Sequence, residues 1–255
     1  MTPCVELIPC LDMAKGRVVK GVQFEGLTDV GDPATLARRY AASGADRLSF
    51  LEVTGTPEGR EALLALLREV SDLQIPLLAG GGVDSVESAE ELVGAGASQV
   101  SVSSAAVKTP ELIDALSQAL GKDAVVVSCD VKTNPVDSGA PKYEVTRSGG
   151  KEPTGRDALE WVEEVERRGA GSIMLNSIST DGAQSGFDLD MLKAVRDRVG
   201  LKIIASGGVG DVDDFVAGAK EGADAVLAAS VFHYGLVSVP DAIAALADAG
   251  FRQCP

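Results

Sequence analysis

The sequence is poor in histidine and in basic side chains, and each shortage excludes a class of protein. His233 is the only histidine, so a metal centre built on several imidazoles is excluded, and no Ser-His-Asp arrangement, Cys-His pair or Walker loop is apparent. We interpret His233 as a packing or hydrogen-bonded residue. Lys and Arg number 23 against 38 Asp and Glu, which gives a formal net charge of −15. Such a charge argues against a nucleic-acid partner and leaves any bound phosphate to local donors.

Long apolar runs and cysteine patterns are also missing. No apolar run approaches the ~18 residues of a membrane span, and the N-terminus shows no charged-then-apolar signal, so we expect a cytoplasmic protein without a membrane partner. Cys4, Cys10, Cys129 and Cys254 show neither metal-ligand spacing nor a disulfide framework. Cys10 and Cys129 lie within apolar runs and are interpreted as reduced packing thiols. We expect no metal and no cofactor.

What the chain does contain is a regular alternation of short runs rich in Val, Ile and Leu with longer amphipathic stretches. The expected strands are 5–10, 47–53, 76–79, 99–103, 124–129, 172–176, 202–205 and 225–228. Helical patterns occupy 33–43, 60–70, 85–95, 110–120, 158–168, 189–199 and 212–222. Most strands are apolar throughout, as buried parallel strands are. Eight strands alternating with helices predict an α/β fold, a (β/α)8 TIM barrel formed by residues 1–255 as a single domain.

Short motifs repeat about half a chain later, which favours this ring over an open doubly wound sheet. Gly80-Gly81-Gly82-Val83 matches Ser206-Gly207-Gly208-Val209 at an offset of 206 − 80 = 126 residues. Ser103-Ser104 matches Ala229-Ser230 at the same offset. Each half thus has a glycine-rich turn, where backbone N–H groups approach an anion closely, and a turn with a hydroxyl donor. The repeat predicts two phosphate-binding turns and a ligand with a phosphate at each end.

The repeat also includes a carboxylate at the end of a strand in each half. Asp12 follows the first expected strand and Asp130 the fifth, on opposite sides of an eight-stranded ring. Polar groups at the carboxyl ends of barrel strands form the active site of this fold. Two carboxylates in different environments can act as general acid and general base. Asp181-Gly182 follows the sixth strand, and Asp181 is read either as a site residue or as a helix cap.

Two connections between a strand and the next helix are long for plain turns. Residues 13–32 carry Lys20 and Phe24, and we expect a binding or closing loop there. Residues 131–155 contain Tyr143-Glu144-Val145-Thr146, which predicts an extra strand in a small hairpin, with a solvated loop as the alternative.

Several longer strings extend these motifs over residues 6–237. They are Leu7-Ile8-Pro9-Cys10-Leu11-Asp12, Gly16-Arg17-Val18-Val19-Lys20-Gly21, Asp181-Gly182 with Ser185-Gly186, and Ala228-Ala229-Ser230-Val231-Phe232-His233. With the glycine-rich turns, they resemble the cyclase subunits of imidazole glycerol phosphate synthase, from histidine biosynthesis. The sister isomerase family has the same half-barrel plan, but these strings fit the cyclase family better.

The resemblance implies a reaction and a set of roles. Ammonia from a glutaminase subunit enters through the barrel and reacts with a ribulosyl formimino-aminoimidazole carboxamide ribonucleotide, a bisphosphate, to give imidazole glycerol phosphate and aminoimidazole carboxamide ribonucleotide. Asp12 and Asp130 would be the acid/base pair, with Lys20 and Phe24 on a closing loop. One phosphate would be held by Gly82, Ser103 and Ser104, and the other by Gly182, Gly208, Ala229 and Ser230.

The chain departs from the family pattern at its strand ends. Ser103 stands where the family has Asn, Glu52 ends strand 2 where Asp is usual, and Ser179 stands where the strand 6 turn usually has its first Asp. In the loop after strand 1, Lys15 replaces a common Asp.

The departures extend to the opposite barrel mouth, where the family carries a ring of charges that gates ammonia. Glu6, Arg47, Gln99 and Ser172 stand where Arg, Glu, Lys and Glu are expected, and Ser98 replaces an Asp that helps activate the glutaminase. Glu6 and Arg47 retain opposite charges and can pair with reversed polarity. The glutaminase partner is therefore in question. Two interpretations stay open beside the cyclase: a paralogue acting on another phosphosugar or nucleotide without the usual glutaminase, and a non-catalytic barrel, against which both Asp residues and both phosphate turns argue.

Overall fold

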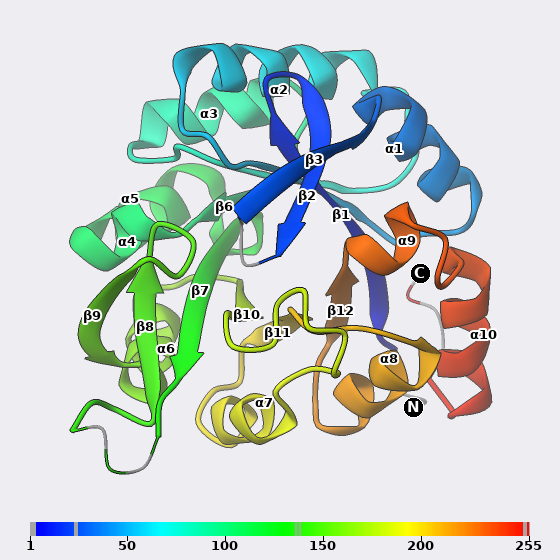
Figure 1. Cartoon of the computed structure of the whole chain (residues 1–255). Coiled ribbons are helices and arrows are strands. Elements are labelled where there is room, and N and C mark those ends of the chain that lie inside the picture. The colour runs from blue at the N-terminus through cyan, green and yellow to red at the C-terminus, as the bar shows by residue number, and fades with distance from the viewer. Residues whose placement is uncertain (1–3, 23–24, 136, 138, 252–253, 255) are drawn as a thin grey trace.

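Eight parallel strands close into a barrel in the computed structural model, which describes residues 4–22, 25–135, 137, 139–251 and 254 (Figure 1). Around the ring they are β1 (Glu6–Ala14), β4 (Leu48–Glu52), β5 (Leu77–Gly80), β6 (Gln99–Val102), β7 (Val125–Thr133), β10 (Ser172–Ser177), β11 (Lys202–Ser206) and β12 (Ala225–Ala228). β12 pairs with β1 and β10 with β7, so the ring has no open edge. The predicted (β/α)8 barrel is confirmed.

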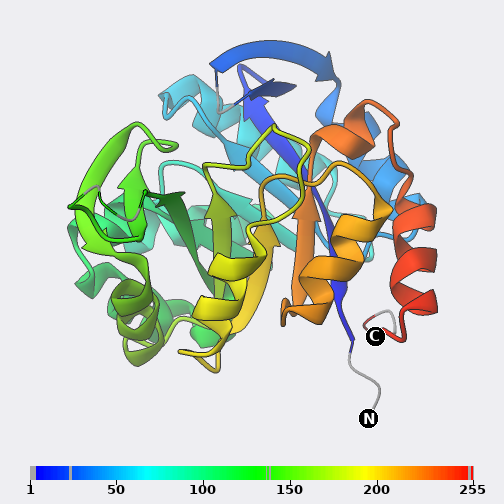
Figure 2. The ribbon, with the colours of Figure 1, turned by 60° about the horizontal axis from the view of Figure 1, so that its bottom comes forward.

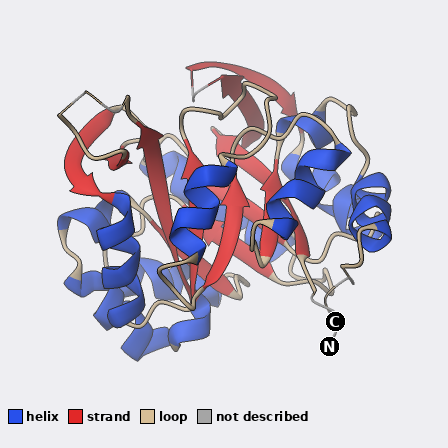
Figure 3. Ribbon diagram, turned by 90° about the horizontal axis from the view of Figure 1, so that it is seen from below, coloured by secondary structure: helices blue, strands red, loops and turns tan. Residues whose placement is uncertain are grey.

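Helices surround the strands on the outside (Figure 3). They are α1 (Pro33–Ala42), α2 (Pro57–Glu69), α3 (Val86–Gly94), α5 (Glu111–Leu120), α6 (Ala158–Arg167), α7 (Leu189–Arg196), α8 (Val212–Lys220) and α10 (Val239–Asp248). The short helices α4 (Ser104–Lys108), α9 (Ser230–His233) and a 3-10 turn, η1 (Lys122–Ala124), complete the set in the described residues. Sequence patterns located the long helices except α10, and missed α4 and α9. In the described part of the chain, none of the helices has the length and apolar character that a membrane span requires.

Alternation along each strand sorts side chains into two cores, because successive residues of a strand point to opposite faces. In β1, Leu7 and Leu11 pack outward against the helix layer, whereas Ile8 and Cys10 pack inside the barrel. The inner cluster also contains Leu78, Val126, Met174, Ile204, Ala225 and Leu227. Apolar side chains therefore lie inside the barrel between its two mouths, and the polar ends of the strands lie above them.

A two-stranded hairpin follows the first strand of each half-barrel. β2 (Arg17–Val22) and β3 (Glu25–Gly31) follow β1, and β8 (Tyr143–Arg147) and β9 (Glu152–Asp157) follow β7 (Figure 2). The extra strand predicted at 143–146 is confirmed. The expectation of a loop over 13–32 is wrong, because β1 continues to Ala14 and pairs with β2. Phe24 lies outside the described residues.

The expectation that the cysteines form no disulfide is wrong for one pair. Cys4 and Cys254 form a disulfide with their Cα atoms 5.2 Å apart, across a sequence separation of 250 residues. Closure of the barrel explains this, because β1 lies beside β12 and so brings the beginning of the chain near its end. Cys10 and Cys129 are buried free thiols, as predicted.

Breaking this disulfide should destabilise the protein. A cross-link between distant residues restricts the unfolded chain, and such bonds typically contribute ~2–4 kcal/mol to the free energy of unfolding. Urea unfolding of the wild type should therefore show a lower midpoint in the presence of a reductant. The Cys4→Ser/Cys254→Ser variant should match the reduced wild type and should not respond to reductant. Equal midpoints for oxidised and reduced wild type would contradict the prediction.

Candidate active site

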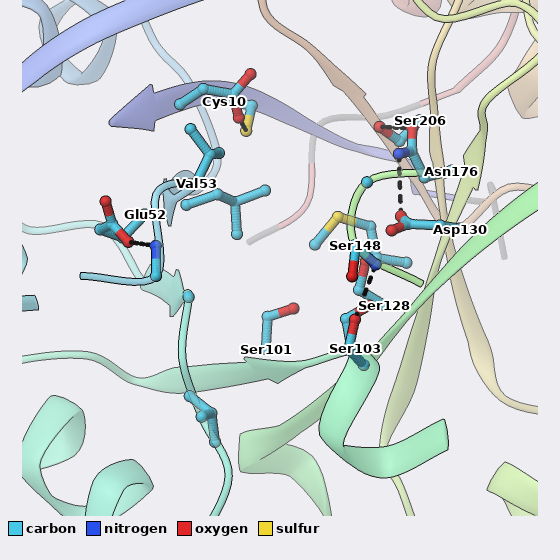
Figure 4. Close-up of a pocket in the computed structure, with 18 of the residues that line it drawn as sticks. Cys10, Glu52, Val53, Ser101, Ser103, Ser128, Asp130, Ser148, Asn176 and Ser206 are labelled. Atoms are coloured by element: carbon cyan, nitrogen blue, oxygen red, sulfur yellow. Dashed lines mark hydrogen bonds between the residues drawn. The ribbon is translucent and has the colours of Figure 1, made fainter. Parts of the chain in front are cut away.

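A cavity of about 1290 Å³ lies at the carboxyl ends of the barrel strands. All the site residues predicted from the sequence line it: Asp12, Lys20, Gly82, Ser103, Ser104, Asp130, Asp181, Gly182, Gly208, Ala229 and Ser230. Figure 4 shows part of this cavity with Asp130 on one side and Cys10 on the other. The sheet topology explains the gathering, because parallel strands bring all their carboxyl ends to the same mouth.

Asp12 shares a buried cation with Asp181. Lys20, from β2, places its Nζ 3.8 Å from Asp12 Oδ2 and 3.5 Å from Asp181 Oδ1. Burial raises the pKa of Asp12, and the charge of Lys20 partly opposes that rise. Burial lowers the pKa of Lys20, but the two carboxylates outweigh it and raise that pKa overall. Lys20 therefore stays protonated and favours an ionised Asp12.

Asp130 has a neutral partner instead of a cation. Asn176 Nδ2 donates to Asp130 Oδ1 over 3.2 Å. Burial raises the pKa of Asp130 to about 6, the hydrogen bond from Asn176 lowers it, and the charge of Asp181 raises it. Asn176 was not among the residues predicted from the sequence. The available signal was an amide directly after the apolar run Ile173, Met174 and Leu175, near the end of β10.

The two carboxylates thus occupy equivalent strand ends in different surroundings. Asp12 has a charged lysine nearby, whereas Asp130 has a neutral amide partner and the like charge of Asp181 near it, and its pKa is raised to about 6. Groups whose pKa values are separated by their environments can divide proton donation and proton acceptance. The arrangement can therefore support general acid–base catalysis on a ligand between the two strands.

The two serine turns have similar backbones. Ser103, before α4, has φ −125° and ψ −100°, and Ala229, before α9, has φ −122° and ψ −73°. Neither helix start carries a side-chain cap, unlike α1, where Asp32 accepts from Thr35 N. The first N–H groups of each turn are therefore available to an anion in the cavity.

The two glycine turns differ in what requires glycine. Gly82 has φ +66°, and an added Cβ would meet nothing within 4 Å, so its backbone faces open space. At Gly208 an added Cβ would lie 2.1 Å from the Gly186 carbonyl oxygen. Packing against the 182–186 turn therefore excludes a side chain at Gly208, whether or not an anion binds.

Glu52, at the end of β4, uses its carboxylate within its own turn. Its Oε1 accepts from Thr54 N over 3.0 Å and its Oε2 from Gly55 N over 2.7 Å, as part of Figure 4 shows. An added Cβ at Gly59 would overlap Glu52 Oε1, so the Glu52 side chain leaves room only for glycine at position 59. Glu52 therefore holds the 53–56 turn that borders the cavity.

His233 contacts an aromatic side chain and no cluster of metal ligands. Its Nδ1 lies 2.7 Å from the Tyr40 hydroxyl, and burial lowers its pKa to about 4, helped by the charges of Lys20 and Arg39. His233 is therefore neutral at ordinary pH. Among the described residues no group of three or more His, Cys, Asp or Glu side chains could hold a metal ion.

At the opposite mouth, polar side chains bond to one another, although the buried Arg47 Nε has no hydrogen-bond partner. Arg47 pairs with Glu6 over 2.6 Å, the reversed pair anticipated from the sequence, and also donates to Gln99 Oε1. Gln99 Nε2 in turn donates to the Asp123 carbonyl oxygen over 2.7 Å. Ser172 is buried at the start of β10.

Ser98, beside this network, is also satisfied within the chain. Its Oγ accepts from Leu77 N over 3.0 Å and donates to Leu77 O over 3.1 Å. This hydroxyl caps the start of β5.

Comparison with known proteins gives the same assignment as the motifs. A family model described as "Histidine biosynthesis protein" matches residues 6–238. The chain belongs to this family.

Three similar relatives are each named "Imidazole glycerol phosphate synthase subunit HisF". The protein from Beutenbergia cavernae is 48% identical, and those from Thermobifida fusca and Corynebacterium diphtheriae are each 47% identical. The matches cover 98–99% of this chain and 99% of each relative. The predicted resemblance to the cyclase family is confirmed, and with it an enzyme of histidine biosynthesis, a lyase of the cyclase type.

Proposed function

We propose that the chain converts the ribulosyl formimino-aminoimidazole carboxamide ribonucleotide and ammonia into imidazole glycerol phosphate and aminoimidazole carboxamide ribonucleotide, with Asp12 and Asp130 as the acid/base pair. We further propose that residues 1–255 form one cytoplasmic domain, and that ammonia enters from the mouth opposite the cavity. One observation carries the proposal: two buried carboxylates and two anion-binding turns, all paired by the half-chain repeat, line a single cavity.

The electrostatics support a doubly phosphorylated ligand held at its ends. The formal net charge is −15, and Asp12, Asp130 and Asp181 are carboxylates that line the cavity. Phosphates are therefore favoured away from these carboxylates, at the backbone N–H groups of the turns. The reacting centre then lies between Asp12 and Asp130.

A turnover assay tests the proposal. The purified protein should release imidazole glycerol phosphate from the ribulosyl substrate when an ammonium salt is supplied. Absence of product from a folded protein, over a range of ammonium concentrations and pH values, would exclude this reaction.

A second candidate is a paralogue that acts on another phosphosugar or nucleotide without a conventional glutaminase. The observation that favours it is the network of Glu6, Arg47 and Gln99 at the opposite mouth, whose side chains bond to one another within the chain. Under this alternative the assay above fails, but binding of a bisphosphate at the two turns remains.

Each anion-binding turn should hold a phosphate, one near Gly82 and Ser104 and the other near Gly208 and Ser230. Crystals grown with phosphate or sulfate should show an anion at both places, bound chiefly by backbone N–H groups. An anion at only one turn would favour a ligand with a single phosphate.

A glycine variant tests the first turn in solution. Gly82→Ala adds a methyl group in the open space beside this turn, at a positive φ that alanine disfavours, and should weaken bisphosphate binding at least tenfold, because hydrogen bonds to charged groups contribute ~1.5–3 kcal/mol. Gly139→Ala is the matched control, since Gly139 also has positive φ (+74°) with nothing near its absent Cβ. Calorimetric titration should show unchanged affinity in the control.

A further inference from the structure

Asp130, Asn176 and Ser206 stand side by side on three neighbouring strands. In the barrel register Asp130 of β7 is the partner of Asn176 of β10, which is the partner of Ser206 of β11. Asn176 Nδ2 donates to Asp130 Oδ1 over 3.2 Å, and Ser206 Oγ donates to Asn176 Oδ1 over 3.3 Å. Figure 4 shows these three side chains as a continuous hydrogen-bonded row on one wall of the cavity.

The row has a fixed direction. An ionised carboxylate only accepts hydrogen bonds, so the amide must present its nitrogen to Asp130. The amide oxygen then faces Ser206, whose hydroxyl can donate to it. Behind the amide, an added Cβ at Gly207 would lie 3.1 Å from Asn176 Oδ1 and 2.7 Å from the Ser177 carbonyl oxygen. A side chain at position 207 would therefore press on this amide, and glycine leaves the row undisturbed.

The other half of the barrel has nothing comparable at the same level. There Asp12 of β1 is the partner of Leu51 of β4, and Leu51 is the partner of Gly80 of β5. Leu51 and Gly80 carry no side-chain donor, and the partners of Asp12 are Lys20 from the hairpin and the Cys10 thiol of its own strand instead. The repeat thus duplicates the carboxylates but not their partners, so the polar row serves Asp130 alone.

We propose that Asn176 and Ser206 are positioning residues for Asp130: the Asn176 amide orients the carboxylate and stabilises its ionised form, and the Ser206 hydroxyl keeps the donor end of that amide toward it. The inference rests on the proposed function, because it gives these residues a catalytic consequence only if Asp130 transfers a proton. It adds two residues of β10 and β11 to a mechanism otherwise assigned to the ends of β1 and β7.

The other groups around Asp130 do not replace this donor. Asp181 faces it with a like charge, and the Cys129 thiol beside it in β7 is neutral, because burial raises its pKa to about 12. From β8, Thr146 Oγ1 donates to the backbone oxygen of Asp130 and not to its carboxylate. Lys20 makes its ion pairs with Asp12 and Asp181. Removing the amide therefore leaves burial and Asp181, which both favour the protonated form.

The test measures the titration of Asp130 itself. Carbon-13 NMR of protein labelled at aspartate carboxyl carbons, assigned by comparison with Asp130→Asn, reports its midpoint without any turnover. In Asn176→Leu, which keeps the bulk but removes the donor, the midpoint should rise by about one pH unit. In Ser206→Ala it should rise less. Ser177→Ala is the control, because Ser177 is the next residue of β10 and its hydroxyl has no hydrogen-bond partner.

The kinetics should follow the titration. The break in the pH profile of kcat that belongs to Asp130 should move upward by the same amount in Asn176→Leu, with KM changed less than kcat. An unmoved Asp130 midpoint in Asn176→Leu would overturn the proposal. If Asn176→Leu does not fold, Asn176→Ala removes the same donor and the same criterion applies.

The positioning role of Asn176 and the catalytic role of Asp130 can be refuted separately. If the Asp130 midpoint rises in Asn176→Leu but Asp130→Asn turns over normally, Asn176 positions Asp130 as proposed, and the proposed catalytic role of Asp130 is wrong. If Asp130→Asn is inactive but the Asp130 midpoint does not move in Asn176→Leu, the catalytic role of Asp130 stands and the positioning role of Asn176 is refuted.

Discussion

Asp130→Asn should lower turnover by ~10²–10⁴-fold and, at the same time, make the folded protein more stable. The loss of rate is the usual contribution of a general acid or base. The gain in stability follows from the burial of the Asp130 carboxyl, which also raises its pKa toward the range of a general acid or base. Burial raises the pKa of Asp130 from 3.8 to about 6, so at neutral pH the fold holds an ionised carboxylate in surroundings that disfavour it.

The pH dependence gives this prediction a sign. Between about pH 4 and pH 6 the folded protein binds more protons at Asp130 than the unfolded chain does, so the free energy of unfolding falls as pH rises through that window. Above about pH 6 the ionised Asp130 lowers the free energy of unfolding by its full amount, at most ~3 kcal/mol. Asparagine is neutral at every pH and should remove this contribution. Urea unfolding of wild type and variant at pH 4 and pH 7 measures it.

Asp12→Asn should lower turnover by a similar factor with a smaller gain in stability, because its carboxylate also pairs with Lys20. Asp72→Asn is the control, since Asp72 is exposed and pairs with Arg38 at the surface. Its turnover should be unchanged. Near-normal rates in both Asp12→Asn and Asp130→Asn would remove the acid–base pair from the mechanism.

The sequence predicted the barrel because the signals for it are local. Apolar runs end at turns, and amphipathic stretches supply the covering helices. The missed hairpin shows where local signals fail. Lys15 and Gly16 both have positive φ, 50° and 73°, and join the paired residues Ala14 and Arg17 as a two-residue hairpin turn. Lysine is uncommon at such a position, so the pattern did not indicate a turn.

The residues of the candidate site also separate into those that local signals predicted and those that they missed. Asp12 and Asp130 were predicted because a repeat in one dimension marks equivalent strand ends. Asn176 and Ser206 were missed because their contact depends on the register of three strands. The Cys4–Cys254 disulfide was missed because it depends on closure of the whole ring. Contacts set by register and closure leave little trace in the order of residues along the chain.

The largest functional departure should appear when the enzyme is supplied with glutamine instead of ammonia. With an ammonium salt and the ribulosyl substrate, we expect turnover to exceed that with glutamine and a conventional glutaminase subunit, such as one from the organism of a similar relative. Charge complementarity at an interface governs encounter and specificity, and mismatched charges there can cost several kcal/mol.

The structure gives this expectation a physical basis at the mouth opposite the cavity. Glu6 begins β1, roughly 20 Å along the strand from Asp12 at ~3.3 Å per residue. Its carboxylate is paired with Arg47, and Arg47 also donates to Gln99. The Ser98 hydroxyl accepts a hydrogen bond from Leu77 N and donates one to Leu77 O. Apart from the unpartnered Arg47 Nε, these groups bond within the chain, and the four charges and the carboxylate that the family resemblance implies for a glutaminase partner are not present here.

Restoring charge should therefore improve coupling. Ser98→Asp combined with Gln99→Lys should increase glutamine-dependent turnover and tighten binding of the glutaminase, while ammonium-dependent turnover changes little because the cavity residues are untouched. The two exchanges add one negative and one positive charge, so the net charge is unchanged and any gain in coupling reflects where the charges lie. Tight 1:1 binding and efficient glutamine-driven turnover by the unmodified chain would show that its internal network at this mouth still supports a conventional partner.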